Sequence, residues 1–443
     1  MTKEIRGKNQ ITEGVIWKQL LIFFFPIAVG TIFQQFYNVV DAVIVGRFVG
    51  KQALASVGGS AAVLSSMVIA FFSGLASGAS VIISQYYGAR DSEGLHRGIH
   101  TAYAFSIMLS VVLAVAGWLL TPWLLTIMNT PADVMADSVT YLRIYFLGLI
   151  ATLTYNMGSS IMRAVGDSKR PLYYLIVCSI CNIILDILLV VVFRMGIAGA
   201  SIATVISQAV SAILVTRSLM TSYDGLKLRL RSIRIDFRTL KSELRIGLPG
   251  GLQFCISGIT NIIIQAAING FGTDTAAAWG AFNKIDMIYW TVCSALGASV
   301  TTFVGQNYGA KKMDRVYKSV RTCLLMAFVM CESLQIFMIL LRHPLVSIFT
   351  TDTSVIEIGG YMILILIPTY IICVFSEIPA GALRGMGDAL VPTVINMIGL
   401  CGVRLPWLLF ILPSRHKLIT LLLSYPVSGS VSTVLMIGYY FVQ

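Results

Sequence analysis

Charged residues are scarce in this chain, at 12% of its 443 residues, and acidic residues are the scarcer kind, with 20 Asp and Glu against 32 Lys and Arg. Hydrophobic residues make up 57% of the sequence. A water-soluble domain of this size cannot cover so much apolar surface with so few polar groups. These proportions exclude an ordinary soluble protein and indicate a chain whose surface faces lipid.

Motifs for nucleotide-driven or metal-dependent chemistry are also lacking. Residues 46–51 have the wrong spacing for a Gly-x-x-x-x-Gly-Lys-[Ser/Thr] phosphate loop. His96 and His100 lie four apart, but no Glu follows His96 as it does in zinc proteases. The Cys178-x-x-Cys181 pair has no second Cys pair or nearby His to complete a metal site. We therefore expect neither an enzyme nor an ATP-driven pump, and no cofactor.

Long apolar runs take the place of the missing polar surface. A helix needs roughly 20 apolar residues to cross a bilayer, and runs of this length recur along the whole chain. We therefore expect an all-α integral membrane protein with about twelve transmembrane helices. The predicted spans lie near residues 16–45, 53–84, 99–120, 139–162, 172–193, 197–217, 247–270, 276–305, 320–341, 358–383, 391–412 and 418–441.

Lysine and arginine are distributed unevenly between the segments that join these spans. With a cytoplasmic N-terminus, the inner segments hold 23 basic residues and the outer loops hold six. Because basic loops stay on the cytoplasmic side, we expect a multi-pass protein of the cell (inner) membrane with both termini cytoplasmic. The basic residues 229–234 predict an anchor to anionic membrane lipid. We expect a monomer without a nucleic-acid partner.

An internal repeat relates the two halves of the chain. Gln-Tyr-Tyr-Gly-Ala-Arg at residues 85–90 recurs as Gln-Asn-Tyr-Gly-Ala-Lys at residues 306–311. Arg-Ala-Val-Gly-Asp at residues 163–167 recurs as Arg-Gly-Met-Gly-Asp at residues 384–388, and both pairs are offset by 221 residues. Six spans per repeat give the halves one orientation. We predict an N-terminal lobe (1–217), a basic cytoplasmic linker (218–246) and a C-terminal lobe (247–443), with a substrate site between the lobes near the midplane.

Polar side chains occupy one face on each of three predicted spans. An ionisable residue within a span is costly, so a function is the first hypothesis for it. At a rise of about 1.5 Å per residue, Asp41, Asp186 and Thr204 reach a similar depth in the outer half of the N-terminal lobe. The faces comprise Gly30, Gln34, Asn38 and Asp41 in the first span, Asn182 and Asp186 in the fifth, and Ser201, Thr204, Gln208 and Ser211 in the sixth.

Two carboxylates, an amide and a hydroxyl at one depth can bind a hard cation through oxygen or share a proton. Asp41, Asn182, Asp186 and Thr204 are therefore the predicted cation site, for H⁺ or Na⁺, and oxygen ligands alone do not choose between them. The alternative for Asp41 is a solvated carboxylate at the outer end of its span, near Arg47.

The second half lacks the same carboxylate, because the repeat places Ile263 at the position of Asp41. Glu377 either faces a substrate cavity or is hydrogen-bonded within its own lobe. Pro26 removes a backbone hydrogen bond from the first span and predicts a hinge. Aromatic side chains near the polar faces either line a cavity or pack the bundle. The predicted cavity residues are Gln34, Tyr37, Asn38, Asn156, Lys284, Asp286 and Glu377.

The order of these motifs resembles the MATE (multidrug and toxic compound extrusion) family of transporters, of the prokaryotic type. The likeness rests on Pro26, the Tyr-Asn-Val-Val-Asp run at residues 37–41, and the repeated Gln-x-Tyr-Gly-Ala and Arg-x-x-Gly-Asp elements. It covers essentially the whole chain.

The resemblance implies export of small organic cations or amphipathic drugs by exchange for H⁺ or Na⁺. It also implies that Asp41, Asn182, Asp186 and Thr204 form the cation site of the N-terminal lobe. The alternative is a flippase for lipid-linked sugars or lipids from the related superfamily. Such proteins often have more spans and a strongly cationic central cavity, whereas most Lys and Arg here lie in the predicted loops.

Overall fold

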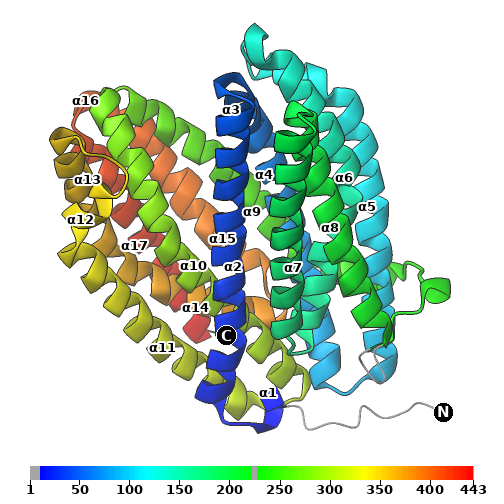
Figure 1. The fold of residues 1–443 in the computed structure, drawn as a ribbon. Helices are drawn as coiled ribbons and strands as arrows, with labels where there is room; N and C mark the ends of the chain where they lie inside the picture. Colours follow the sequence, from blue (N-terminus) through cyan, green and yellow to red (C-terminus); the bar gives the residue numbers. More distant parts are fainter. Residues whose placement is uncertain (1–9, 222–226, 443) are drawn as a thin grey trace. The chain divides into compact units, whose positions relative to one another are not determined.

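The computed structural model describes residues 10–221 and 227–442, and all regular structure in these ranges is helical (Figure 1). Lys3, Arg6 and Lys8, which contribute to the predicted orientation, and residues 222–226 of the predicted linker lie outside the described residues. Twelve helical stretches of the described chain are long and apolar enough to cross a membrane. The predicted all-α membrane fold is therefore confirmed.

The first half of the chain contains six of these stretches. The helices of its third and fourth spans extend well beyond the predicted spans, because their polar ends continue as helix although they are too polar for hydropathy to mark. The elements are α1 (Gln10–Glu13), α2 (Ile16–Phe48), α3 (Lys51–Gly58), α4 (Ser60–Gly88), α5 (Ser92–Ile127), α6 (Ala132–Ala164), α7 (Lys169–Asp186), the π-helical turn η1 (Ile187–Val192) and α8 (Gly196–Thr221).

The second half repeats this order with more interruptions. Its fourth span contains a short 3₁₀ segment, and its fifth span contains two π-helical segments. The elements are η2 (Leu230–Ser232), α9 (Phe237–Asn269), α10 (Thr273–Gly309), α11 (Met313–Leu340), α12 (Arg342–Ser347), α13 (Thr353–Leu366), η3 (Ile367–Tyr370), α14 (Ile371–Met386), α15 (Leu390–Met397), η4 (Ile398–Arg404), η5 (Trp407–Ile411), α16 (Leu412–Ser414) and α17 (Leu418–Val442).

The described chain forms two compact units. Unit 1 contains Phe25–Gly251, and unit 2 contains Leu252–Gln443 together with Asn9–Phe24. The boundaries of the predicted lobes lie between helices, whereas the boundaries of these units lie within two helices, α2 and α9. The division of α2 falls directly before Pro26, and the division of α9 falls two residues after Pro249. The first long helix of each half is therefore shared between the units.

Glycines allow α4 and the first part of α9 to cross at close range within unit 1. A Cβ atom added to Gly74 would meet the backbone of Gly251, and one added to Gly78 would meet the backbone of Glu243 and Gly247. Small residues at a four-residue spacing permit such close backbone approach. The Gly74-x-x-x-Gly78 element therefore has a structural role, which places the start of α9 in unit 1.

The chain between α8 and α9 is fixed to unit 1 by hydrogen bonds where the structure describes it. The Arg229 backbone N–H donates to Nε2 of His100 at 3.0 Å, and the Asp236 N–H donates to the Thr101 hydroxyl at 3.1 Å. Leu228 is 2% exposed and packs in the core of unit 1. His100 therefore helps to position the linker on unit 1.

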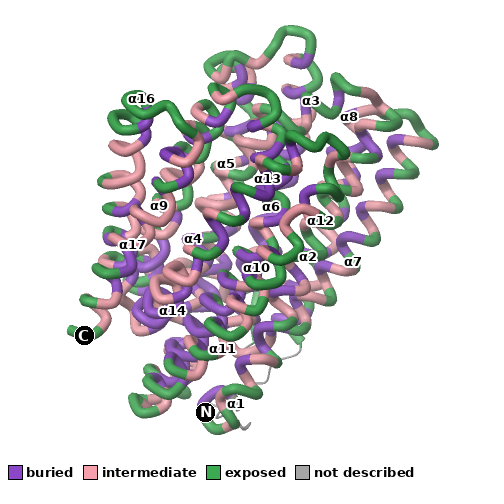
Figure 2. Tube along the Cα trace, turned by 90° about the vertical axis from the view of Figure 1, so that its left-hand side faces the viewer, coloured by how far each residue is buried: buried purple, intermediate pink, exposed green. Residues whose placement is uncertain are grey.

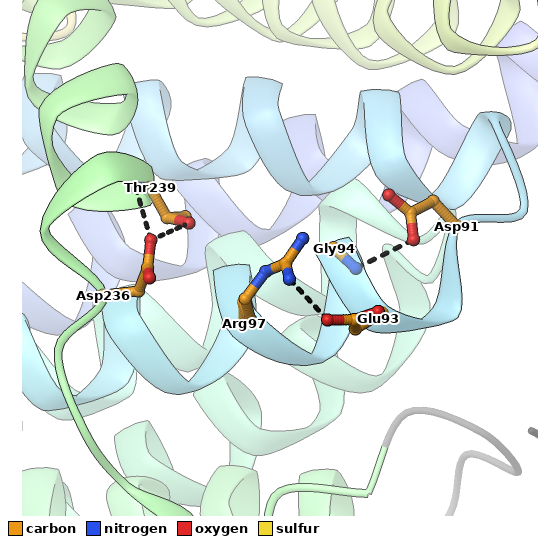
Figure 3. A network of polar contacts seen from close by, with 6 residues as sticks. All are labelled: Asp91, Glu93, Gly94, Arg97, Asp236 and Thr239. Atoms are coloured by element: carbon orange, nitrogen blue, oxygen red, sulfur yellow. Dashed lines mark hydrogen bonds and ion pairs between the residues drawn. The ribbon is translucent and has the colours of Figure 1, made fainter.

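Aspartates cap the first turns of two helices, α5 and α9, in unit 1 (Figure 3). The Asp91 carboxylate accepts from the Gly94 N–H at 2.9 Å, which caps α5. The Asp236 carboxylate accepts from the backbone N–H and the hydroxyl of Thr239 at 2.8 and 2.7 Å. These two bonds lower the pKa of Asp236, because they favour its ionised form.

Candidate cation-coupling site

Helices α2 and α7 bring the two predicted carboxylates together inside unit 1. Asp41 lies about two turns before the end of α2, and Asp186 is the last residue of α7. The Asp41 and Asp186 carboxyl groups lie within hydrogen-bonding reach of each other. They are far apart in the sequence, so the packing of α2 against α7 creates the pair.

The sequence of α7 explains why its polar residues point inward. Its large apolar residues Tyr173, Ile180 and Ile184 are 55–59% exposed, on the side that lipid would cover. Asn182 and Asp186 are 0% exposed on the other side. Figure 2 shows this alternation of exposed and buried residues along α7. The amphipathic pattern therefore directs an amide and a carboxylate into the protein.

The polar atoms of this site have few partners within the described residues. Oδ1 of Asp41, both carboxyl oxygens of Asp186, and both polar atoms of the Asn182 side chain are buried without a hydrogen-bond partner. Two ionised carboxylates cannot donate hydrogen bonds to each other. A shared proton or a bound cation would satisfy these oxygens and relieve their repulsion.

Helix α8 brings the fourth predicted residue to the same level. The Cys178 thiol lies near Ser207 and Ser211, which indicates the register of the neighbouring helices α7 and α8 (Figure 1). The two helices are antiparallel, so Asn182, four residues after Cys178, lies level with Thr204. The Thr204 hydroxyl donates to the Ala200 carbonyl at 3.1 Å. Both lone pairs of its oxygen are left to accept a proton or ligate a cation.

Tyrosines from α6 complete the surroundings and were not predicted from the sequence. Tyr141 lies within electrostatic range of both Asp41 and Asp186, and its ring stacks on Tyr145 at 6.2 Å. Tyr37 lies within range of Asp41 and of both tyrosines. The signal was present in the sequence, because Tyr141 and Tyr145 are four residues apart and share one helix face.

The remaining predicted cavity residues of unit 1 have varied environments. Gln34 and Asn38 are exposed on α2, and Tyr37 is half-buried. The Asn38 amide donates to Oε1 of Gln35 at 3.3 Å. Asn156 on α6 donates to the Thr152 carbonyl one turn earlier at 2.9 Å. Gln34 and Asn38 are thus exposed on α2, whereas Asn156 is hydrogen-bonded within its own helix.

In unit 2, the predicted cavity residues separate into paired and unpaired charges. Glu377 forms an ion pair with Arg384 at 2.8 Å, which is the hydrogen-bonded arrangement within its own half. Lys284 is exposed, and Asp286 is half-buried on the same helix, α10. A role for Glu377 in attracting substrate stays a prediction, and it would require this ion pair to open.

No group of three His, Cys, Asp or Glu side chains that could hold a metal ion occurs in residues 10–221 and 227–442. A cation at the N-terminal site would therefore depend on the two carboxylates together with amide and hydroxyl oxygens. Carboxylate, amide and hydroxyl oxygens can together bind a hard cation or share a proton.

The twelve candidate spans and the internal repeat define a polytopic membrane protein built from two similar halves. The sequence model of the MatE family matches residues 26–188 and 249–409. The probable multidrug resistance protein YoeA of Bacillus subtilis is 30% identical over 434 residues, covering 96% of this chain and 93% of that protein. The chain belongs to the MatE family, and the resemblance seen in its sequence is confirmed.

Further comparisons agree on the fold. The multidrug export protein MepA of Staphylococcus aureus is 21% identical over 436 residues, covering 93% of this chain and 94% of that protein. A crystal structure of a MATE protein in a bent conformation superimposes with a TM-score of 0.92 at 21% identity, covering 98% of this chain and 97% of that one. These matches extend over nearly the full length of both chains.

Proposed function

We propose that this protein is a secondary active antiporter that exports cationic or amphipathic organic compounds in exchange for H⁺ or Na⁺. The names of the relatives YoeA and MepA support multidrug export. The coupling ion would bind at Asp41, Asn182, Asp186 and Thr204. The observation that carries the proposal is the meeting of half-buried Asp41 with buried Asp186. Within the described residues, Oδ1 of Asp41 and both carboxyl oxygens of Asp186 are buried without a hydrogen-bond partner.

The mechanism follows from competition between charge states. With the site empty, the two carboxylates repel each other and favour a separated arrangement of α2 and α7. A bound proton or cation favours the arrangement in which they meet. A ligand shifts such an equilibrium only by its different affinity for the two states. Pro26 gives α2 a hinge at which its outer part changes position, because the proline removes one backbone hydrogen bond.

The proposed substrate contacts are Gln34, Tyr37 and Asn38 on α2, next to the carboxyl pair. Asn156, Lys284, Asp286 and Glu377 are the further candidates. We also propose that the protein lies in the cell membrane with both termini in the cytoplasm, which the 23 inner and six outer basic residues support.

Transport in proteoliposomes tests the proposal, with Na⁺ and H⁺ gradients imposed separately and tetraphenylphosphonium as the probe cation. We expect one gradient to drive probe movement in the wild type. Asp41→Asn should abolish this response, while Asp137→Asn, an exposed carboxylate of α6, should retain it. A wild type that responds to neither gradient would contradict the proposal, as would an Asp41→Asn variant that keeps the full response.

A further inference from the structure

Unit 2 contains a carboxylate and a guanidinium that have no charged partner within the described residues. The carboxylate is Asp286 on α10, whose Oδ1 is buried without a hydrogen-bond partner. The Tyr370 hydroxyl and the Trp290 indole lie within hydrogen-bonding reach of the same carboxyl group. Asp286 and Trp290 are one helical turn apart, so they share a face of α10.

The guanidinium is that of Arg404, at the end of the π-helical segment η4. Its Nε and Nη2 donate to the Ser428 hydroxyl of α17 at 3.0 and 2.8 Å. Its central carbon lies 4.1 Å from the centroid of the Tyr425 ring. A hydroxyl and an aromatic face therefore fix the position of Arg404 without neutralising its charge.

These two charges lie near the same two side chains, Tyr425 and Cys373. The Tyr425 side chain lies within electrostatic range of both Arg404 and Asp286, and so does the Cys373 thiol. The Tyr425 ring lies 6.1 Å from the Trp279 ring of α10, and Trp290 lies 5.7 Å from Tyr370. The charges are thus neighbours on an aromatic surface, but they do not form an ion pair.

An unpaired carboxylate and an unpaired guanidinium in one membrane-spanning bundle are costly, because each loses hydration without gaining a counter-ion. The same unit pairs its charges elsewhere, since Glu377 and Arg384 meet at 2.8 Å. Arg404 is instead held on α17, apart from Asp286. Two opposite charges kept separate in this way fit a ligand that brings both counter-charges itself.

We propose that Asp286 and Arg404 bind a zwitterionic organic compound, with its cationic group at Asp286 and its carboxylate at Arg404, against the rings of Trp290 and Tyr425. The inference rests on the proposed export of organic compounds and deepens it. A preference for cations alone would require Asp286 but would give the Arg404 guanidinium no counter-ion. The bidentate fit of guanidinium to carboxylate supplies the selectivity.

Two dyes that differ only in one carboxylate test this inference. The probes are the rhodamine that carries a free benzoate, which is zwitterionic, and its methyl ester, which is a simple cation. Export of each is followed by fluorescence in proteoliposomes. We expect Arg404→Gln to lower the ratio of free-acid to ester export about tenfold, equivalent to about 1.4 kcal/mol, because only the free acid carries the carboxylate that Arg404 binds. Arg404→Lys should restore part of the ratio, because it keeps the charge.

The controls separate this inference from the proposed function. Asp286→Asn should reduce export of both dyes, because both carry the cationic group. Arg415→Gln, which removes an exposed guanidinium of unit 2, should leave the ratio unchanged. Export of the ester by Arg404→Gln also shows that the variant is folded. If the wild type exports neither dye nor tetraphenylphosphonium, the proposed function fails. If the wild type exports the ester and Arg404→Gln leaves the ratio unchanged or impairs both dyes equally, only the zwitterion site is refuted.

Discussion

Asp186→Asn should uncouple drug binding from cation binding. In the wild type, two carboxylates about 4 Å apart repel by about 4 kcal/mol at an effective dielectric constant of about 20. The Asp41 and Asp186 carboxyls lie within hydrogen-bonding reach, so they experience a repulsion of this order when both are ionised. The substitution keeps the shape of the side chain and removes one of the two charges. The electrostatic reason for a proton or cation to favour the joined arrangement is then lost.

Only part of this repulsion energy is expected to affect the affinity for the substrate. Coupling between two binding sites typically amounts to 1–3 kcal/mol, or about 5- to 150-fold in affinity. We therefore expect drug affinity in the wild type to change by at least about fivefold over a titration of pH or of Na⁺. In Asp186→Asn, this change should fall below about twofold. Asn182→Ala should weaken cation binding with less effect on the drug, because it removes an oxygen ligand but no charge.

The assay is equilibrium binding of the esterified rhodamine to purified protein, followed by fluorescence polarisation across pH at fixed Na⁺ and across Na⁺ at fixed pH. Asp137→Asn serves as the matched control, because it removes an exposed carboxylate from the same unit. The reasoning is refuted if wild-type affinity responds to neither variable. It is also refuted if Asp186→Asn keeps the full dependence.

Further substitutions test the packing, the linker and the topology. Gly251→Ala should lower the thermal unfolding midpoint, because overpacking costs about 1–3 kcal/mol. Gly258→Ala on the same helix is the control and should not lower the midpoint, because no atom lies within 4 Å of the new Cβ. Asp236→Ala should lower the midpoint at neutral pH. Because the pKa of Asp236 is lowered in the folded state, its contribution to folding stability is present above the unfolded pKa and is lost as the pH falls through the folded pKa. The unfolding midpoints of wild type and Asp236→Ala should therefore converge in acid. Cysteine introduced at Ser222 should react only from the cytoplasmic side and cysteine at Ala132 only from outside; the reverse pattern would overturn the proposed orientation.

Hydropathy and the internal repeat predicted the twelve spans, because each helix that crosses a bilayer requires a run of roughly 20 apolar residues. Hydropathy missed the polar ends of α5, α6 and α9, where helix continues beyond the apolar run. The division of α2 and α9 between the two units could not be predicted either. No local sequence pattern indicates that the start of α2 packs in unit 2 while residues 237–251 of α9 pack in unit 1. Such partnerships depend on tertiary contacts that a linear pattern does not encode.

The candidate site was predictable to the extent that helical spacing and depth determine it. The meeting of Asp41 with Asp186 followed from their equal depth. By contrast, the pairing of Glu377 with Arg384 at 2.8 Å could not be decided, because depth alone does not show which way a side chain turns. Asp286 was a predicted cavity residue, but its neighbourhood with Arg404 was not predicted, since the two residues lie on helices far apart in the chain.

The packing of the N-terminal segment in unit 2 has a consequence for biosynthesis. Arg315 donates to the backbone carbonyls of Ile11 and Gly14 at 2.9 and 2.8 Å, across sequence separations of 304 and 301 residues. At a translation rate of about 5–20 residues per second, the segment leaves the ribosome about 15–60 s before Arg315 is made. During this interval the start of α2 is without its final neighbours, although the rest of the helix already belongs to unit 1. Truncation of the N-terminal segment, which is synthesised first, should therefore impair the folding of unit 2, which is synthesised last.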